Sequence, residues 1–275
     1  MVLLTDAIAH TLIIAYKEDT QQLEACLTEQ GFDCRVVRQQ HQPEYQGYSP
    51  SYLCLLNHCA AWRQVIELGQ PALICEADFV PVKRLGQRPL PYAPTLSNVG
   101  IAWLYTCAPQ IYSVSPQNHA IGFSTSMVAY ILTPIGAQHL LEHAQQIAEN
   151  PGPTQYSAWD SEVEEFLRQR QLNSYVPWRN YGEHGGKPNP EHKKAGLSPA
   201  HRADVLYGPL AFTPIYAEGQ SPSGLPVFYS RLKARTKGLG RLVLGKYVRP
   251  PVLAGSKTPL HMLKFAVGRQ LTLWP

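Results

Sequence analysis

The chain has 275 residues, 44% of them hydrophobic, which suffices for one large domain or for one domain with an appendage. It contains no run of about 18 apolar residues, so a membrane-spanning helix is not expected. Residues 1–9 lack the basic start and long apolar stretch of a secretory signal, and we predict a cytoplasmic protein. The six cysteines show no metal-binding spacing and are expected to be buried free thiols.

The net charge of +4 conceals an uneven distribution. No Asp or Glu follows Glu218, whereas ten Lys or Arg residues do, which leaves 14 basic and 20 acidic residues in 1–218. An acidic body is thus followed by a basic segment, residues 219–275. Such asymmetry predicts a polyanion or an anionic membrane surface as the neighbour of the basic segment.

The beginning of the chain alternates strand and helix signals. Residues 10–16 are a short apolar run typical of a buried strand, residues 18–29 carry apolar side chains at helical spacing before Gly31, and residues 32–37 are a second strand candidate. A strand, a helix and a strand within about 28 residues indicate a βαβ unit and hence the start of a parallel sheet.

A longer helix and a compact strand come next. Residues 52–67 place apolar side chains every three or four positions, which predicts a helix with one buried stripe. Residues 72–75 form a short apolar strand. The segments 39–51 and 81–98 are punctuated by polar residues, glycine and proline, and are predicted to be loops.

The later part of the body continues this alternation. We predict strands over 99–105, 127–132 and 173–177 and helices over 134–149 and 160–171. Residues 181–198 are rich in Gly, Pro, His and Lys and are predicted to be a long loop. The order of elements predicts an α/β fold with a mostly parallel central sheet.

Two carboxylates follow the strand of residues 72–75. Glu76 and Asp78 are two residues apart, so in an extended chain their side chains point to the same side. They repel each other unless a cation lies between them, and Mg²⁺ or Mn²⁺ prefers carboxylate and phosphate oxygens. Ligands of open α/β sheets bind just beyond the carboxyl ends of the strands. The pair predicts a divalent metal site, with an ordinary solvated turn as the alternative.

Three segments carry a resemblance to a known family. Residues 52–62 (Tyr-Leu-Cys-Leu-Leu-Asn-His-Cys-Ala-Ala-Trp) are similar to a G-x-x-G-C-x-x-S-H-x-x-x-W helix, and residues 73–78 (Leu-Ile-Cys-Glu-Ala-Asp) to an apolar strand ending in Glu-Asp-Asp. Residues 127–141 are similar to an A-Y-x-I-x-x-x-G-A-x-x-L-L segment, and Trp159-Asp160 stands where an Asp opens a helix. In this order and spacing they resemble glycosyltransferase family 25, the lipooligosaccharide and collagen-type galactosyl- and glucosyltransferases.

The resemblance implies a GT-A-like nucleotide-binding sandwich over residues 1–218, with residues 219–275 as a basic amphipathic extension. It implies metal-dependent, inverting transfer of a hexose from a UDP-sugar to a cell-surface glycan or glycolipid, with Mn²⁺ or Mg²⁺ as cofactor. Glu76 and Asp78 would hold the metal and the donor's ribose or phosphate. Asp160 is the candidate base for the acceptor hydroxyl, unless its carboxylate only caps a helix.

Four further side chains are candidates for the same site, each with an ordinary alternative. Tyr16 could stack on the uracil or be an aromatic residue at a strand edge. His58 could support the acidic strand end, touch the donor or be a core histidine. Beside two glycines, His184 and Lys187 offer a third metal ligand and a phosphate countercharge, unless residues 181–187 are a plain surface loop.

Two departures from the family pattern leave a second function open. Ala77 replaces the middle acid of Glu-Asp-Asp, and Asn57 replaces the serine before His58. They favour, as the alternative, a non-catalytic membrane-associated glycan-binding or assembly protein derived from this fold. A nucleotidyltransferase would need a Gly-rich phosphate loop near the first strand, which residues 15–17 do not form.

The basic segment interleaves its ten cations with apolar residues. Leu260, Leu263, Val267 and Leu271 predict a short amphipathic helix that ends near Trp274. Such a segment is typical of proteins bound to an anionic bilayer surface, where each Lys or Arg contributes about 1 kcal/mol. A solvated or domain-packing extension is the alternative. A nucleic-acid partner is not expected, because the body is acidic and no recognition motif accompanies the charge.

Overall fold

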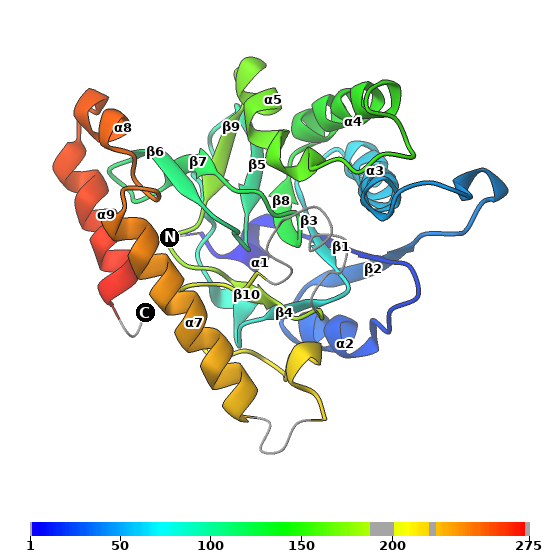
Figure 1. Ribbon diagram of the computed structural model, residues 1–275, viewed down its shortest axis with the longest axis horizontal. Helices are drawn as coiled ribbons and strands as arrows, with labels where there is room; N and C mark the ends of the chain where they lie inside the picture. The colour runs from blue at the N-terminus through cyan, green and yellow to red at the C-terminus, as the bar shows by residue number, and fades with distance from the viewer. Residues whose placement is uncertain (1, 188–200, 220–223, 273–275) are drawn as a thin grey trace.

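The computed structural model describes residues 2–187, 201–219 and 224–272 (Figure 1). At its centre is an eight-stranded sheet. In spatial order the strands are β2 (Asp33–Arg38), β1 (His10–Ala15), β3 (Ala72–Glu76), β8 (Ala129–Leu132), β5 (Val99–Trp103), β9 (Asn173–Val176), β7 (Ala120–Phe123) and β6 (Gln110–Val114).

Most strands of this sheet run in one direction. β1 is parallel to β2 and β3, and β5 is parallel to β9. β8 is antiparallel to both of its neighbours, β3 and β5, and β7 is antiparallel to β9 and β6. Six strands therefore share one direction, and β8 and β7 oppose them. The prediction of an α/β protein with a mostly parallel central sheet is confirmed, while the GT-A assignment stays a prediction.

Helices cover both faces of the sheet. Since successive strand residues point to opposite faces, one strand can contribute side chains to the core on each side. Leu12 and Ile14 of β1 belong to one core cluster and Ile13 belongs to the other. Figure 1 shows α3 and α4 on one side and α2 on the other. The first face packs against α3 (Pro50–Leu68), α4 (Pro134–Glu149), α5 (Val163–Gln169) and α9 (Pro259–Leu271), and the second against α1 (Leu4–Ala7) and α2 (Gln21–Glu29).

The helix beside the acidic strand end begins and ends as its sequence dictates. The Ser49 hydroxyl accepts a hydrogen bond from the Tyr52 amide, Pro50 occupies the first turn, and Gly69 ends α3 with a left-handed φ of 66°. The predicted helices of residues 52–67 and 134–149 are confirmed as α3 and α4. The buried residues of α3 are Tyr52, Leu55, Asn57, His58, Cys59, Ala61, Trp62 and Val65.

Several elements differ from the sequence prediction. β6 and β7 were not predicted, nor was the small antiparallel sheet of β4 (Phe79–Pro81) and β10 (Gly182–His184). β10 lies inside the segment predicted to be a loop, of which residues 188–198 lie outside the described ranges. These strands are three to five residues long, so they depend on hydrogen bonds to distant partners more than on a sequence period.

The basic segment is largely helical and packs on the body. α7 (Gly224–Val243) and α8 (Pro250–Gly255) were not predicted, and α9 corresponds to the predicted amphipathic helix; Trp274 lies outside the described residues. Figure 1 shows α7 and α9 side by side, and they contact each other. Within the described ranges, no helix combines the length and the apolarity needed to span a bilayer. The domain boundary after residue 218 stays a prediction.

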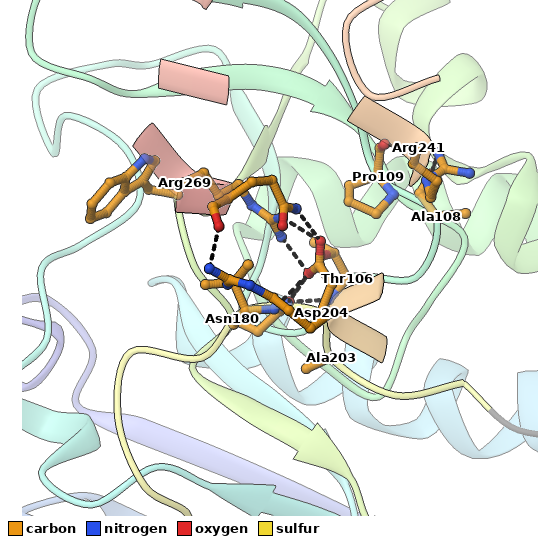
Figure 2. A network of polar contacts seen from close by, with 12 residues as sticks. Thr106, Ala108, Pro109, Asn180, Ala203, Asp204, Arg241 and Arg269 are labelled. Carbon is orange, nitrogen blue, oxygen red and sulfur yellow. Dashed lines mark hydrogen bonds and ion pairs between the residues drawn. The ribbon is translucent and has the colours of Figure 1, made fainter. Parts of the chain in front are cut away.

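A buried polar network fixes the basic segment to the body (Figure 2). Arg269 of α9 is fully buried and donates to both carboxylate oxygens of Asp204, with an Nη2–Oδ1 distance of 2.7 Å. Gln270 and Asn180 also donate to this carboxylate. The Asn180 side chain in turn accepts from the amide and the hydroxyl of Thr106, which follows β5 by three residues.

A second buried carboxylate anchors α7. Arg231 lies 2.6 Å from Glu183, whose side chain is fully buried in β10. Glu183 is adjacent to His184, one of the predicted metal ligands. The basic segment therefore contacts Glu183, the neighbour of His184 in the candidate site described next.

Candidate active site

Three side chains predicted as metal ligands lie together at the carboxyl end of β3. Glu76 is the last residue of β3, Asp78 follows in the turn to β4, and His184 ends β10. β10 pairs antiparallel with β4 so that His184 faces Phe79, which brings His184 beside Asp78. One potential ligand atom from each of the three residues lies within 4.8 Å of the others. Their role as metal ligands stays a prediction.

The chemistry of this cluster fits a divalent cation. One oxygen of Asp78 lies 3.0 Å from Nε2 of His184, whereas its other oxygen, Oδ1, is buried without a hydrogen-bond partner among the described residues. An orphaned buried acceptor of this kind is completed by a cation or water. Two carboxylates and an imidazole nitrogen suit a first-row transition ion such as Mn²⁺ better than Mg²⁺, which prefers oxygen ligands alone.

The charge of Asp78 also acts on the histidine. Burial alone would lower the pKa of His184, but the neighbouring Asp78 carboxylate and its hydrogen bond outweigh burial, and the pKa is raised. Without a cation, the imidazole thus tends to bind a proton. A metal ion and this proton compete for the same nitrogen, so metal binding should release protons and strengthen as pH rises.

Two glycines allow the loop after β10 to approach Asp78. A Cβ atom at Gly186 would lie 2.2 Å from Oδ2 of Asp78 and 3.2 Å from Nε2 of His184, and one at Gly185 would lie 2.6 Å from Val80. Contacts this short do not occur between real atoms, so a Cβ at position 186 would displace the Asp78 carboxylate. Arg202 fixes the loop by donating to the carbonyls of His184 and Gly186 at 2.9 and 2.8 Å.

Replacing Gly186 with Ala is therefore expected to separate Asp78 from His184 and weaken Mn²⁺ binding by about tenfold or more. Calorimetric titration of the protein with MnCl₂ measures this effect. Gly255→Ala is the matched control, because a Cβ at Gly255 meets no heavy atom within 4 Å. Equal affinities of the two variants would mean that the Asp78–His184 pair does not hold the ion.

Glu76 contacts the side chain of His58, which is fully buried. The Trp62 indole donates to the Tyr130 hydroxyl at 2.8 Å, and this hydroxyl lies 2.8 Å from Nδ1 of His58. Because indole can only donate, the Tyr130 hydroxyl proton is free to go to Nδ1, which leaves the proton of His58 on Nε2, 3.4 Å from Glu76. This geometry favours the predicted support of the acidic strand end over direct contact of His58 with a donor.

A cavity of about 450 Å³ lies in front of the acidic pair. It is bounded by the ends of β1 and β3 and the start of α3, and Tyr16, Glu76 and Asp78 line it. The Tyr16 ring is 38% exposed and Lys17 lies 4.8 Å above its centroid. Lys187 is exposed three residues after His184 and does not line this cavity.

The negative charge of Glu76 also acts on the carboxyl group of Asp160. Burial, followed by the negative charge of Glu76, raises the pKa of Asp160 to about 7. A carboxyl group with a pKa near 7 can accept or return a proton at neutral pH. Asp160 lies in the 3₁₀ helix η3 (Trp159–Ser161), and Glu162 occupies the N-cap position of α5. Asp160 is therefore not the N-cap residue of α5, and its role as the base stays a prediction.

One part of the site gave no signal in the sequence. Arg202 holds the loop of His184 through main-chain carbonyls, and such a contact has no sequence pattern. Cys107 lies with its sulfur 3.0 Å from Nδ1 of His201, and burial raises the pKa of this thiol to about 11, so it stays protonated. All six cysteines are free thiols, but the expectation that they are buried holds only for Cys59 and Cys75, and the other four are partly exposed.

Comparisons with known proteins add little to this geometry. No protein-family model matches the chain, and no curated protein matches it. Among solved structures, the chain is similar to a glycosyltransferase involved in the glycosylation of the major capsid of PBCV-1, with a TM-score of 0.42 and 10% identity over 62% of this chain and 83% of that chain. A similarity at this level does not establish a shared fold. The assignment to family 25 stays a prediction.

Proposed function

We propose that the protein is a metal-dependent glycosyltransferase that moves a hexose, with inversion, from a UDP-sugar to a glycan or glycolipid acceptor. The observation that supports it most is the convergence of Glu76, Asp78 and His184 beside a cavity at the carboxyl ends of β1 and β3. Ligands of open α/β sheets bind at this position. The resemblance of residues 52–141 to family 25 supplies the class of donor.

The residues of the candidate site would have different roles in such a reaction. Glu76, Asp78 and His184 would hold Mn²⁺ or Mg²⁺, which supplies the positive charge that a departing diphosphate needs. Tyr16 presents an exposed aromatic ring at the cavity for the uracil. Lys187 supplies a countercharge for phosphate from the adjoining loop. Asp160, with its pKa near 7, would take the proton of the acceptor hydroxyl.

The two departures from the family pattern leave three candidate metal ligands in the site. Asn57 is buried and donates to the carbonyl of Ala15 at 3.1 Å, so it ties α3 to the end of β1. Ala77 contributes its amide to the carbonyl of Ile14 at 3.0 Å, and three candidate ligands remain without its side chain. The three remaining ligands favour the enzyme over the non-catalytic alternative.

A nucleotide titration tests the proposal. The wild-type protein is expected to bind UDP with Mn²⁺ and to lose this binding in EDTA, because the metal bridges protein and diphosphate. Asp78→Ala should weaken both Mn²⁺ and UDP binding by about tenfold or more. Glu149→Ala at the exposed end of α4 is the control and should bind both as the wild type does. Metal-indifferent or absent UDP binding would contradict the proposal and favour the non-catalytic alternative.

A further inference from the structure

Exposed apolar side chains are concentrated in the basic segment. Fourteen large hydrophobic residues are exposed in the described part of the chain, and ten of them lie within residues 224–271. The ten are Leu225, Phe228, Tyr229, Leu232, Val243, Leu244, Leu260, Leu263, Val267 and Leu271. Single exposed apolar residues are ordinary on protein surfaces, whereas such a concentration marks a surface that another phase or molecule covers.

On α7 four of these residues form one stripe opposite the buried face of the helix. Leu225, Phe228, Tyr229 and Leu232 are spaced by three, one and three residues, which places them on one side of a helix, and they are 51–65% exposed. The buried residues of α7, Ala234 and Gly238, lie on the opposite side of the helix. The helix is therefore anchored by one face and apolar on the other.

α9 has the same two-faced construction. Met262, Phe265 and Ala266 enter the core cluster on the first face of the sheet. The predicted stripe of Leu260, Leu263, Val267 and Leu271 is on the outside instead, with exposed fractions from 37% to 73%. An α9 that served only to pack on the body would need no apolar residues on this side.

The charged side chains of the basic segment are all of one sign. No acidic residue follows Glu218. Four arginines of the segment are used inside the protein: Arg231 and Arg269 pair with carboxylates, and Arg235 and Arg241 donate to main-chain carbonyls. The remaining six cations are exposed: Lys233, Lys237, Lys246, Arg249, Lys257 and Lys264.

We propose that the outer faces of α7 and α9 form a docking surface for an anionic lipid bilayer. Exposed apolar stripes flanked by Lys and Arg match an interface in which acyl chains lie beneath negatively charged headgroups. A second copy of the chain would set six exposed cations against six others with no acid between them, so charge disfavours a dimer through this surface. The stripe predicted from the sequence thus contacts lipid directly.

A cavity beside α7 fits the same partner. It has a volume of about 950 Å³, and Phe228 and Leu232 of the α7 stripe line it together with the exposed Lys83. Apolar walls beside an exposed lysine suit an acyl chain and its phosphate headgroup. Arg231 of α7 also contacts Glu183, the neighbour of His184, so the docking surface lies on the same structural unit as the candidate active site.

Vesicle binding by the full-length protein tests the proposal without relying on its enzymatic activity. Binding to vesicles of phosphatidylcholine mixed with phosphatidylglycerol is expected to be at least about tenfold tighter than to phosphatidylcholine alone, and to weaken as salt is raised. Phe228→Glu with Leu263→Glu should reduce binding to the anionic vesicles at least about tenfold. Lys233→Glu with Lys264→Glu should do the same by charge alone.

The matched control places the same charges elsewhere. Leu96→Glu with Ile135→Glu alters two exposed apolar residues outside the segment and should bind vesicles as the wild type does. Urea unfolding checks that each variant folds. Equal binding to neutral and anionic vesicles, no binding to either, or an equal loss in the control would overturn the proposal. So would a wild-type dimer that Phe228→Glu with Leu263→Glu converts to monomers without any vesicle binding.

Discussion

Replacing Asp160 with Asn is expected to lower the rate of sugar transfer by about 10²- to 10⁴-fold, the usual contribution of a general base. Asn has nearly the same shape as Asp but cannot accept the proton of an acceptor hydroxyl. Mn²⁺-dependent UDP binding should not change, because Asp160 is not one of the three clustered ligands. A radiolabelled transfer assay and UDP calorimetry on the same variant separate the two effects.

The pKa of Asp160 gives this prediction a second readout. In the metal-free protein the side-chain carbon of Asp160 should titrate near pH 7 in a ¹³C NMR experiment, since burial and the charge of Glu76 both raise the pKa. Mg²⁺ bound beside Glu76 adds positive charge and should lower the pKa of Asp160. The base is active when deprotonated, so transfer should fall as pH drops through the pKa of the metal-loaded protein.

The stability of the same variant excludes unfolding as the cause of lost activity. The folded-state pKa of Asp160 is about 7, above its ordinary value of 3.8, so above pH 7 the folded protein bears a cost for holding this charge. Asp160→Asn removes that cost and should unfold at a temperature no lower than the wild type at pH 8. A variant with wild-type transfer rates would exclude Asp160 as the base.

The fold was predictable where the chain repeats a pattern over many residues. α3 and α4 are long, carry a clear stripe and have a Ser or Thr cap followed by proline, and their predicted limits agree with the structure within two residues. β1 and β3 are continuous apolar runs because both of their faces are covered. β7 and β10 have three or four residues each and were missed, since their existence depends on partners far along the chain.

The candidate site was predictable only in part, for a related reason. Glu76 and Asp78 could be placed because a strand end is a local feature. His184 could be named from its glycine-rich surroundings, but its position beside Asp78 depends on the pairing of β10 with β4, which no local pattern announces. The burial of His58 under Glu76 and the clamp formed by Arg202 follow from tertiary packing alone.

The role of each individual charge in the basic segment could not be predicted from the sequence. Ten Lys or Arg residues within a segment that contains no Asp or Glu are typical of a solvated or membrane-bound tail. The structure uses Arg269 and Arg231 to neutralise two carboxylates of the body, Asp204 and Glu183. A periodic apolar stripe was correctly assigned to α9, but the side of the helix that enters the core carries Met262 and Phe265. Both faces of α9 are apolar, so the pattern alone did not say which face is inside.

Breaking the Asp204–Arg269 pair is expected to lower stability more than the loss of any other single contact between the basic segment and the body. Arg269 is fully buried, and Asp204→Asn leaves its charge without a counterion (Figure 2). Loss of one partner of a buried pair costs about 3–5 kcal/mol, against a total stability of about 5–15 kcal/mol for a typical domain. Urea unfolding at pH 7 measures the difference. Glu142→Gln removes the exposed pair with Arg170 and should cost at most about 1 kcal/mol.

The pH dependence of the same variant identifies the carboxylate as the cause. Burial alone would raise the pKa of Asp204, but Arg269 and the hydrogen bonds from Gln270 and Val205 lower it to about 2, below its ordinary value of 3.8. The stabilisation is therefore complete above pH 3.8 and is lost as pH falls through 2. The gap between wild type and Asp204→Asn should be constant from pH 7 to 5 and shrink below pH 4. A gap that is the same at pH 2.5 and pH 7 would mean that lost packing, and not the ion pair, sets the stability of the docked α9.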